Sequence, residues 1–195
     1  MKQRPRVIVN LPRADAGPGA RDVETHGETH RLTPLTEKDY GPLYWQQPKW
    51  FRREWSLVSE RGEHLLLHGH GISRRKLAAE TPAATWALAR GWGGNVTLAD
   101  AEGRELACMP RGWFGRSRLE LPDGPALVWR WHWGRAYTLE DEEGREWLRI
   151  QRRFALLRFQ AVVTLSETVR RRSDLLELLA VTYFAWLSAP RGHAH

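Results

Sequence analysis

A threefold internal repeat constrains what this chain can fold into more than any other feature of its sequence. Phe51, Trp92 and Trp133 follow one another at intervals of 41 residues, and the same interval relates three further sets of similar residues without a gap. These sets are Ser56, Thr97 and Thr138; Leu57, Leu98 and Leu139; and Gly62, Gly103 and Gly144. A repeat of this length predicts three copies of one supersecondary unit that bury a common core.

Each repeat has the pattern of short β-strands joined by tight turns. From Leu43 onward, short segments rich in Trp, Val, Leu, Thr and Tyr alternate with Gly, Pro and Asp, which is typical of an all-β domain. The repeated glycines mark turns, because glycine adopts positive φ in a hairpin loop without a Cβ clash. The pattern predicts about twelve strands, four per repeat, at 43–46, 54–59, 64–70, 76–81, 84–89, 95–100, 105–110, 116–121, 126–130, 136–140, 146–151 and 161–165.

Twelve strands in three repeats can be arranged as a propeller or as one barrel. Propellers typically need about four to eight blades to close, which is more than three repeats supply. A closed antiparallel barrel leaves no exposed strand edge, so we expect this architecture. About eight strands already enclose an interior that side chains fill, so the lumen of a twelve-stranded barrel must hold water, a ligand or another part of the chain.

The C-terminal region predicts a buried hydrophobic helix over 174–188 that suits this lumen. Ser173 or Asp174 can serve as the N-cap, and Glu177 stands in the capping-box position. Residues 178–187 are apolar around the whole helix circumference, so the helix must be surrounded. A membrane-inserted helix is the alternative, but a span needs about 20 apolar residues. We therefore expect no transmembrane span.

The rest of the chain adds tails to this domain. Residues 1–38 are rich in Pro, Gly, Asp, Arg and Thr and predict a mostly disordered tail, followed by the barrel domain over 39–190 and a second tail over 191–195. Cys108 is the single cysteine, and no apolar segment follows the first residues. These features favour the cytoplasm, with peripheral attachment to a membrane as a further option.

The repeated hairpins that end at Gly62, Gly103 and Gly144, together with the closing helix 174–188, resemble a known superfamily. A twelve-stranded barrel around a hydrophobic C-terminal helix is similar to the tubby C-terminal domain, the phospholipid scramblases and the plant LURP-one-related proteins. The resemblance covers roughly residues 40–190. It implies phosphoinositide binding, as in tubby-like domains, or a role in the movement of lipids between leaflets, as for scramblases. It assigns no lipid-binding residue to a position of this chain.

The positive charge indicates an anionic partner. The formal net charge is +7, and six arginines flank the last predicted strand: Arg152, Arg153, Arg158, Arg170, Arg171 and Arg172. If they converge on one face, each contributes about 1 kcal/mol near an anionic leaflet, whereas scattered arginines contribute little. The leading hypothesis is therefore a nonenzymatic binding module for anionic lipid surfaces or an acidic protein. Charge that serves only solvation, on a structural scaffold, is one alternative.

Binding of single-stranded nucleic acid is another alternative. The chain has eleven tryptophans, and aromatic and basic residues are interleaved in 51–55 and 129–133. Such segments can stack bases. Aromatic residues that recur at one position in all three repeats are better explained as core or rim residues of the barrel, with arginine stacked outside them. We therefore rank nucleic acid below an anionic surface.

Metal and enzymatic functions have weak support. His68 and His70 share one face of a strand and form a weak candidate for a zinc pair. His68 corresponds to Met109 and Ile150 in the repeat, which favours a packed histidine or a strand end. The acidic turn 140–143 lacks the spacing of a calcium-binding EF-hand loop. No nucleophile elbow, phosphate-binding loop, dinucleotide motif or zinc-protease helix occurs in the sequence. We expect no cofactor and no enzymatic activity, and the oligomeric state stays open.

Overall fold

The computed structural model describes residues 19–25, 27–39, 41–47, 52–69, 75–112, 116–122, 124–132, 136–155 and 158–189. Of residues 154, 155, 158 and 159 it describes the backbone alone. His70, one member of the predicted histidine pair, lies outside the described residues, as do Phe51 and Trp133 of the repeat.

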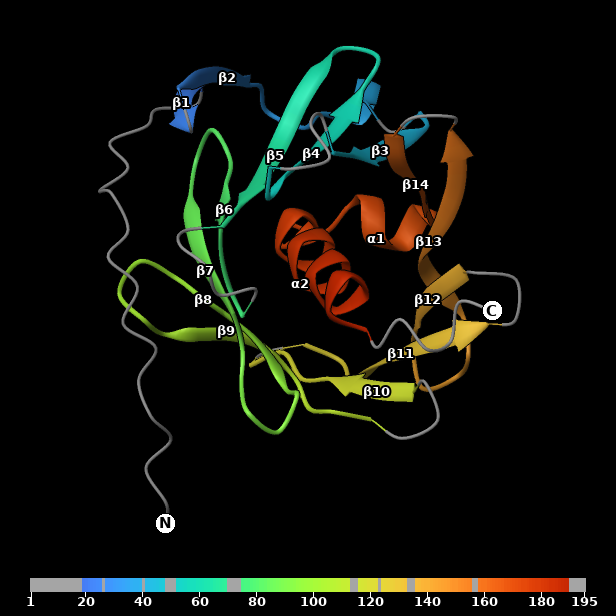
Figure 1. Cartoon of the computed structure of the whole chain (residues 1–195). Helices are drawn as coiled ribbons and strands as arrows, with labels where there is room; N and C mark the ends of the chain where they lie inside the picture. Colours follow the sequence, from blue (N-terminus) through green and yellow to red (C-terminus); the bar gives the residue numbers. More distant parts are fainter. Residues whose placement is uncertain are drawn as a thin grey trace.

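Twelve strands stand at the twelve predicted positions, four in each repeat (Figure 1). They are β3 (Leu43–Gln46), β4 (Glu54–Ser59), β5 (Gly62–His68), β6 (Lys76–Glu80), β7 (Thr85–Arg90), β8 (Val96–Ala99), β9 (Glu105–Met109), β10 (Arg116–Leu119), β11 (Leu127–His132), β12 (Ala136–Glu140), β13 (Glu146–Ala155) and β14 (Arg158–Leu165). Neighbours in sequence pair antiparallel throughout each repeat except at β9 and β10, and β14 pairs antiparallel with β3. The last repeat therefore closes onto the first.

The remaining seam of the barrel lies between β9 and β10. It is joined by a single bridge, in which the backbone groups of Cys108 and Glu120 exchange hydrogen bonds of 2.9 and 2.7 Å. The result is a nearly closed barrel, as the repeat predicts. Because antiparallel strands alternate in direction, the six connections that leave odd-numbered strands lie at one end of the barrel, and the turns that leave even-numbered strands lie at the other.

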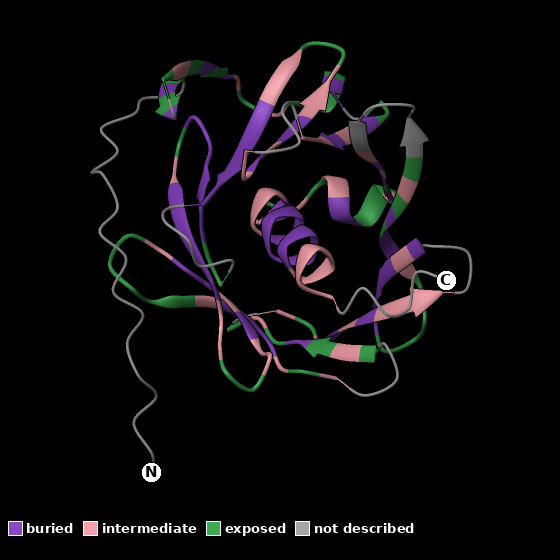
Figure 2. Ribbon diagram, viewed as in Figure 1, coloured by how far each residue is buried: buried purple, intermediate pink, exposed green. Residues whose placement is uncertain are grey.

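The predicted central helix is confirmed. α2 (Leu175–Ser188) lies inside the ring of strands, and its side chains from Leu178 to Phe184 are buried (Figure 2). Tyr183 stacks on Trp45 of β3 with ring centroids 4.1 Å apart and an interplanar angle of 6°. Burial strongly raises the pKa of Tyr183, so its phenol stays neutral in the core. The lumen is thus filled by side chains of the chain itself.

The start of the helical region differs from the prediction. Asp174 occupies the N-cap position of α2, but its side chain makes no capping hydrogen bond. Its carboxylate instead accepts two hydrogen bonds of 2.7 Å from the guanidinium of Arg172. A short helix that the sequence did not predict, α1 (Glu167–Arg170), comes before it and is capped by Ser166, whose hydroxyl accepts from the Val169 amide.

The hairpin turns of the second and third repeats share one construction. In each, an aspartate carboxylate accepts hydrogen bonds from the backbone and the guanidinium of an arginine four residues later, Arg104 at Asp100 and Arg145 at Asp141. Gly103 and Gly144 take φ of +79° and +80° in these turns, where a Cβ would be strained. The predicted role of these glycines as turn residues is confirmed.

The first repeat is built with a different register. Leu57 pairs with Leu65, whereas its equivalents Leu98 and Leu139 pair with Ala107 and Leu148, one position further along the repeat. A shift of one residue turns the side chains of a strand to the opposite face. Ala107 and Leu148 point into the barrel core, but their equivalent in the first repeat lies on the outer face of β5.

A β-hairpin formed by residues 21–32 covers this outer face of β5. The prediction that residues 1–38 are mostly disordered is therefore wrong for these residues. β1 (Arg21–Thr25) and β2 (Glu28–Leu32) pair antiparallel, and β2 adds to β5 through a parallel pair between Leu32 and Glu63. Leu32, Val23 and Leu66 form a separate buried cluster. The sequence prediction missed this hairpin because its apolar residues are few and each strand is only five residues long.

Asp39 ties the segment between the hairpin and the barrel to the end of β4. It lies in a 3₁₀ turn, η1 (Glu37–Asp39), is 5 % exposed, and accepts hydrogen bonds from the Thr36 amide (2.9 Å) and the Thr36 and Ser59 hydroxyls (2.6 and 3.3 Å). Burial acts to raise the pKa of Asp39, but the hydrogen bonds from Thr36 outweigh it and hold the pKa below its ordinary value of 3.8.

We expect Asp39→Ala to lower the free energy of unfolding by about 1–3 kcal/mol at pH 7, because it removes these buried hydrogen bonds. A carboxylate with a lowered pKa adds stability above its ordinary pKa of 3.8, and this stability is lost as the pH falls through the folded-state pKa. Urea unfolding of both proteins between pH 7 and pH 2 should therefore show the difference shrinking in acid. Asp22→Ala, at an exposed position of β1, is the control. A difference that stays constant with pH would contradict a role for the ionised carboxylate.

Candidate functional site

The structure divides the six predicted arginines between the two ends of the barrel. Arg152 and Arg153 lie near the end of β13, and Arg158 begins β14, with its side chain outside the description. Arg170, Arg171 and Arg172 follow the other end of β14, after α1 begins. Arg153 pairs with Gln160, and β14 continues for five more residues to its end at Leu165. These five steps cover about 16 Å along the strand, so the two groups of arginines lie that far apart along the barrel. Arg152 and Arg153 therefore lie at a different end of the barrel from Arg170, Arg171 and Arg172.

The arginines at the α1 end are partly neutralised by nearby acids. Arg170 forms an ion pair of 2.9 Å with Glu167, and Arg172 binds Asp174. The first turn of α2 adds Glu177, whose pKa is raised by burial and by the negative charges of Asp174 and Asp100. The turns at this end carry further acids, including Asp100, Glu102, Asp141, Glu142 and Glu143. This end of the barrel is of mixed charge.

The opposite end is strongly basic. The connections from odd-numbered to even-numbered strands, with the strand residues beside them, contain one acidic residue, Glu54. Their described cations define what we call the basic end: Arg52, Arg53, Arg75, Lys76, Arg90, Arg111, Arg116, Arg152 and Arg153. Of the six predicted arginines, Arg152 and Arg153 therefore belong to the basic end. The other seven cations of the basic end were not predicted, because they are scattered along the sequence. Only the antiparallel topology brings them to one end of the barrel.

Trp92 projects from the basic end. It lies in the connection between β7 and β8 and is 92 % exposed, and no other large hydrophobic side chain in the described part of the chain is exposed to this degree. The guanidinium carbon of Arg75 lies 3.9 Å from the centroid of its ring. Repeated aromatic residues were expected in the core or at the rim of the barrel with arginine stacked on them, and Trp92 with Arg75 is such a stacked pair at the rim.

A shallow hollow of about 420 Å³ lies on the outer wall over β10 and β11 and reaches the turn between β12 and β13 at the α1 end. It is lined by Arg116, Ser117, Arg118, Ala126, Val128 and Glu142. Arg116 stands directly opposite Arg130 in the strand pair, and the Glu140 carboxylate lies 3.3 Å from the guanidinium of Arg130. Glu142 pairs with Arg118 at 3.2 Å.

The weak zinc candidate His68 makes a different contact. Because of the register shift, it lies on the outer face of β5 rather than in the core with Met109 and Ile150. Its Nε2 lies 2.6 Å from the Glu80 carboxylate, and the guanidinium of Arg21 approaches the same carboxylate at 3.5 Å. His68 therefore belongs to the buried contact between the β1–β2 hairpin and the barrel, in which Glu80 binds both His68 and Arg21. His68 is thus a packed histidine, as the repeat favours, but it is buried on the outer face of β5 and not in the barrel core.

These features define a class of protein: a nearly closed antiparallel β-barrel of three four-stranded repeats around a central helix, with one basic end that carries an exposed tryptophan. No protein-family model, curated protein or solved structure matches the chain. Within the described residues, no helix has the length and apolar character needed to cross a membrane.

Proposed function

We propose that this protein is a nonenzymatic binding module whose basic end docks reversibly on anionic membrane surfaces. The observation that carries the proposal is the position of Trp92, 92 % exposed at the end of the barrel where the nine described cations of the basic end gather. Of these cations, Arg52 is paired with Glu28 and Glu54. Tryptophan prefers the headgroup level of a bilayer, where its ring is half in an apolar environment. Each nearby cation adds about 1 kcal/mol of attraction to an anionic leaflet.

Two further features support docking from this end. α2 fills the lumen, so a partner is met by the outer surface of the barrel. The acids are concentrated at the opposite end, so the field of an anionic surface would orient the molecule with Trp92 toward the lipid. The resemblance to tubby-like domains, scramblases and LURP-one-related proteins belongs to the same proposal, and it makes phosphoinositides a lipid class to include in its test.

Single-stranded nucleic acid remains the second candidate, because Arg75 and Trp92 together could stack one base. A nucleic-acid platform normally presents several aromatic side chains along a groove, whereas the described residues expose one. This difference favours the membrane surface.

Flotation with vesicles tests the proposal. We expect the protein to float with vesicles that contain phosphatidylserine or a phosphoinositide, not with phosphatidylcholine alone, and to be released by high salt. Arg111→Glu at the basic end should weaken binding by about 2 kcal/mol, roughly 30-fold, because it replaces an attraction with a repulsion. Trp92→Ala should also weaken binding, with a loss that persists across salt concentrations since apolar insertion is not screened.

Arg171→Glu is the matched control, because Arg171 is equally exposed but lies at the α1 end. It changes the net charge by the same amount and should leave vesicle binding within twofold of the wild type. Equal losses for Arg111→Glu and Arg171→Glu would mean that overall charge alone attracts the protein. Displacement of the vesicles by single-stranded DNA or RNA would instead favour the nucleic-acid candidate.

A further inference from the structure

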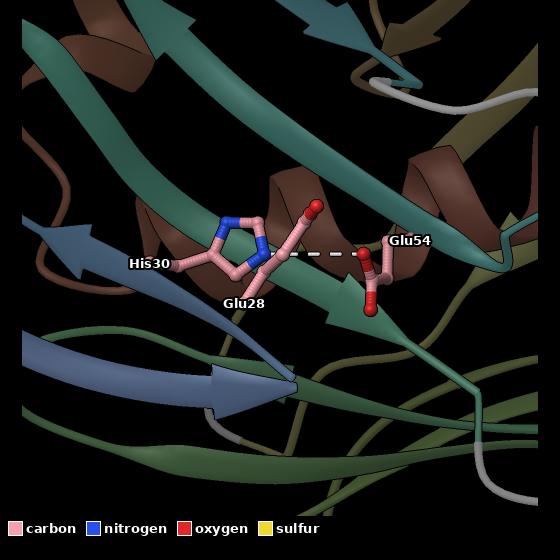
Figure 3. A group of neighbouring side chains, drawn as sticks. All are labelled: Glu28, His30 and Glu54. Carbon is pink, nitrogen blue, oxygen red and sulfur yellow. Dashed lines mark ion pairs between the residues drawn. The ribbon is translucent and has the colours of Figure 1, made fainter. Parts of the chain in front are cut away.

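Three potential metal ligands meet where the β1–β2 hairpin covers the barrel. Glu28 and His30 come from β2 and Glu54 from the start of β4, and their ligand atoms all lie within 4.8 Å of one another (Figure 3). His30 is 7 % exposed and Glu54 1 %, whereas the side chain of Glu28 is 36 % exposed. The cluster is therefore buried on one side and reached from solvent past Glu28.

His30 is held in the orientation that a metal ligand requires. Its Nδ1 lies 3.1 Å from the carboxylate of Glu63. A carboxylate can only accept, so Nδ1 donates the hydrogen and a neutral ring then carries its lone pair on Nε2. Metal-binding histidines are commonly fixed by a carboxylate in this way.

The other ring nitrogen points into the cluster. Nε2 of His30 is buried and has no hydrogen-bond partner among the residues that the structure describes. An oxygen of the Glu54 carboxylate lies 3.9 Å from it, along the dashed line in Figure 3. A lone pair that faces a carboxylate in a buried position is unfavourable unless a proton or a metal ion lies between them.

The local charge also suits a divalent cation. Glu28, Glu54 and Glu63 bring three negative charges, and Arg52 brings one positive charge at 2.9 Å from Glu28 and 3.9 Å from Glu54. Among these four residues the carboxylates outnumber the cation, and a divalent ion is attracted by such an excess. Arg52 is the cation that such an ion has to displace from the two carboxylates.

We propose that Glu28, His30 and Glu54 bind a divalent transition metal ion of the zinc type, with Glu63 orienting His30. One imidazole and two carboxylates are ligands that Zn²⁺ accepts, with a fourth position left for water. Bonds of about 2.0–2.2 Å place tetrahedral ligand atoms about 3.4 Å apart. The ligand atoms here lie within 4.8 Å of one another, so rotation of the glutamate side chains has to bring them closer by up to about 1.4 Å (4.8 − 3.4). The ion joins β2 to β4 and so holds the hairpin on the barrel.

Calorimetric titration of the full-length, chelator-treated protein with Zn²⁺ tests the site, and Co²⁺ serves as a spectroscopic probe. We expect one saturable Zn²⁺ site per chain, a visible absorption band for bound Co²⁺ and a higher melting temperature with metal. His30→Gln and Glu54→Gln should weaken Zn²⁺ binding at least 100-fold, and Glu63→Gln about tenfold as a positioning residue. Arg52→Gln should tighten binding, because it removes the competing cation.

His68→Gln is the matched control, since it changes a histidine of the same buried contact that pairs with Glu80. It should leave the affinity and the cobalt spectrum unchanged. If His30→Gln fails to fold, Glu28→Gln at the solvent edge decides in its place, with an expected loss of at least tenfold. Absence of a saturable site, or Zn²⁺ binding that survives Glu28→Gln and His30→Gln unchanged, would overturn the proposal and leave the cluster as an ion-pair network around protonated His30.

Discussion

Leu179→Asp is expected to abolish folding of the barrel. Leu179 is 0 % exposed and lies on α2 at the centre of the main core cluster. Its loss removes about 2–5 kcal/mol of packing, and the new carboxylate must be desolvated without a partner, which costs several kcal/mol more. The sum approaches the roughly 5–15 kcal/mol by which a domain of this size is stable.

The measurement is circular dichroism with urea unfolding of the purified variant. We expect no cooperative transition for Leu179→Asp. Leu179→Met, which conserves volume, should fold with a loss below about 1.5 kcal/mol, and Leu187→Asp, near the half-buried end of α2, should cost less than Leu179→Asp. A near-native, cooperative melt of Leu179→Asp would show that α2 is dispensable for closing the barrel.

Trp45→Ala is expected to have the second largest effect, a loss of about 3–5 kcal/mol in the free energy of unfolding. Trp45 is 0 % exposed and stacks on Tyr183, so it joins the wall of the barrel to the helix inside it. Removal leaves a large cavity at this contact, and the stack itself contributes about 0.5–1.5 kcal/mol beyond the buried area.

Trp92→Ala is the matched control, because the same substitution is made at a side chain that is 92 % exposed. Its effect on urea unfolding should stay within about 0.5 kcal/mol. The two variants also separate stability from binding. Trp92→Ala should weaken vesicle binding without loss of stability, whereas Trp45→Ala should lower the free energy of unfolding. Equal losses of stability in both variants would contradict the buried stack as the link between β3 and α2.

The repeated strands could be predicted because their signals are local. Glycines at turn positions such as Gly103 and Gly144, alternating apolar residues and the constant 41-residue interval act within a few residues of one another. The helix 175–188 could be predicted because a segment that is apolar on all sides has to be enclosed. The same reasoning does not extend to α1, whose four residues carry no periodic pattern.

The candidate functional residues were predicted less well. Sequence proximity grouped Arg152 with Arg172, but β14 carries the chain from one end of the barrel to the other between them. Arg75, Trp92 and Arg111 lie in three different strand connections, and the ring of antiparallel strands brings these connections to one end. Glu28 and Glu54 likewise meet only because β2 docks beside β4 and β5.

The sequence by itself determined the three repeats, the twelve strands and the enclosed helix, because each follows from local turn chemistry and hydrophobic periodicity. The tertiary structure alone decided the one-residue register shift of β5, the docking of β1 and β2 on its outer face and the separation of charge between the two ends. These depend on pairing energies between distant segments. A register shift exchanges the two faces of a strand without changing its local pattern, so only contacts across the fold can select it.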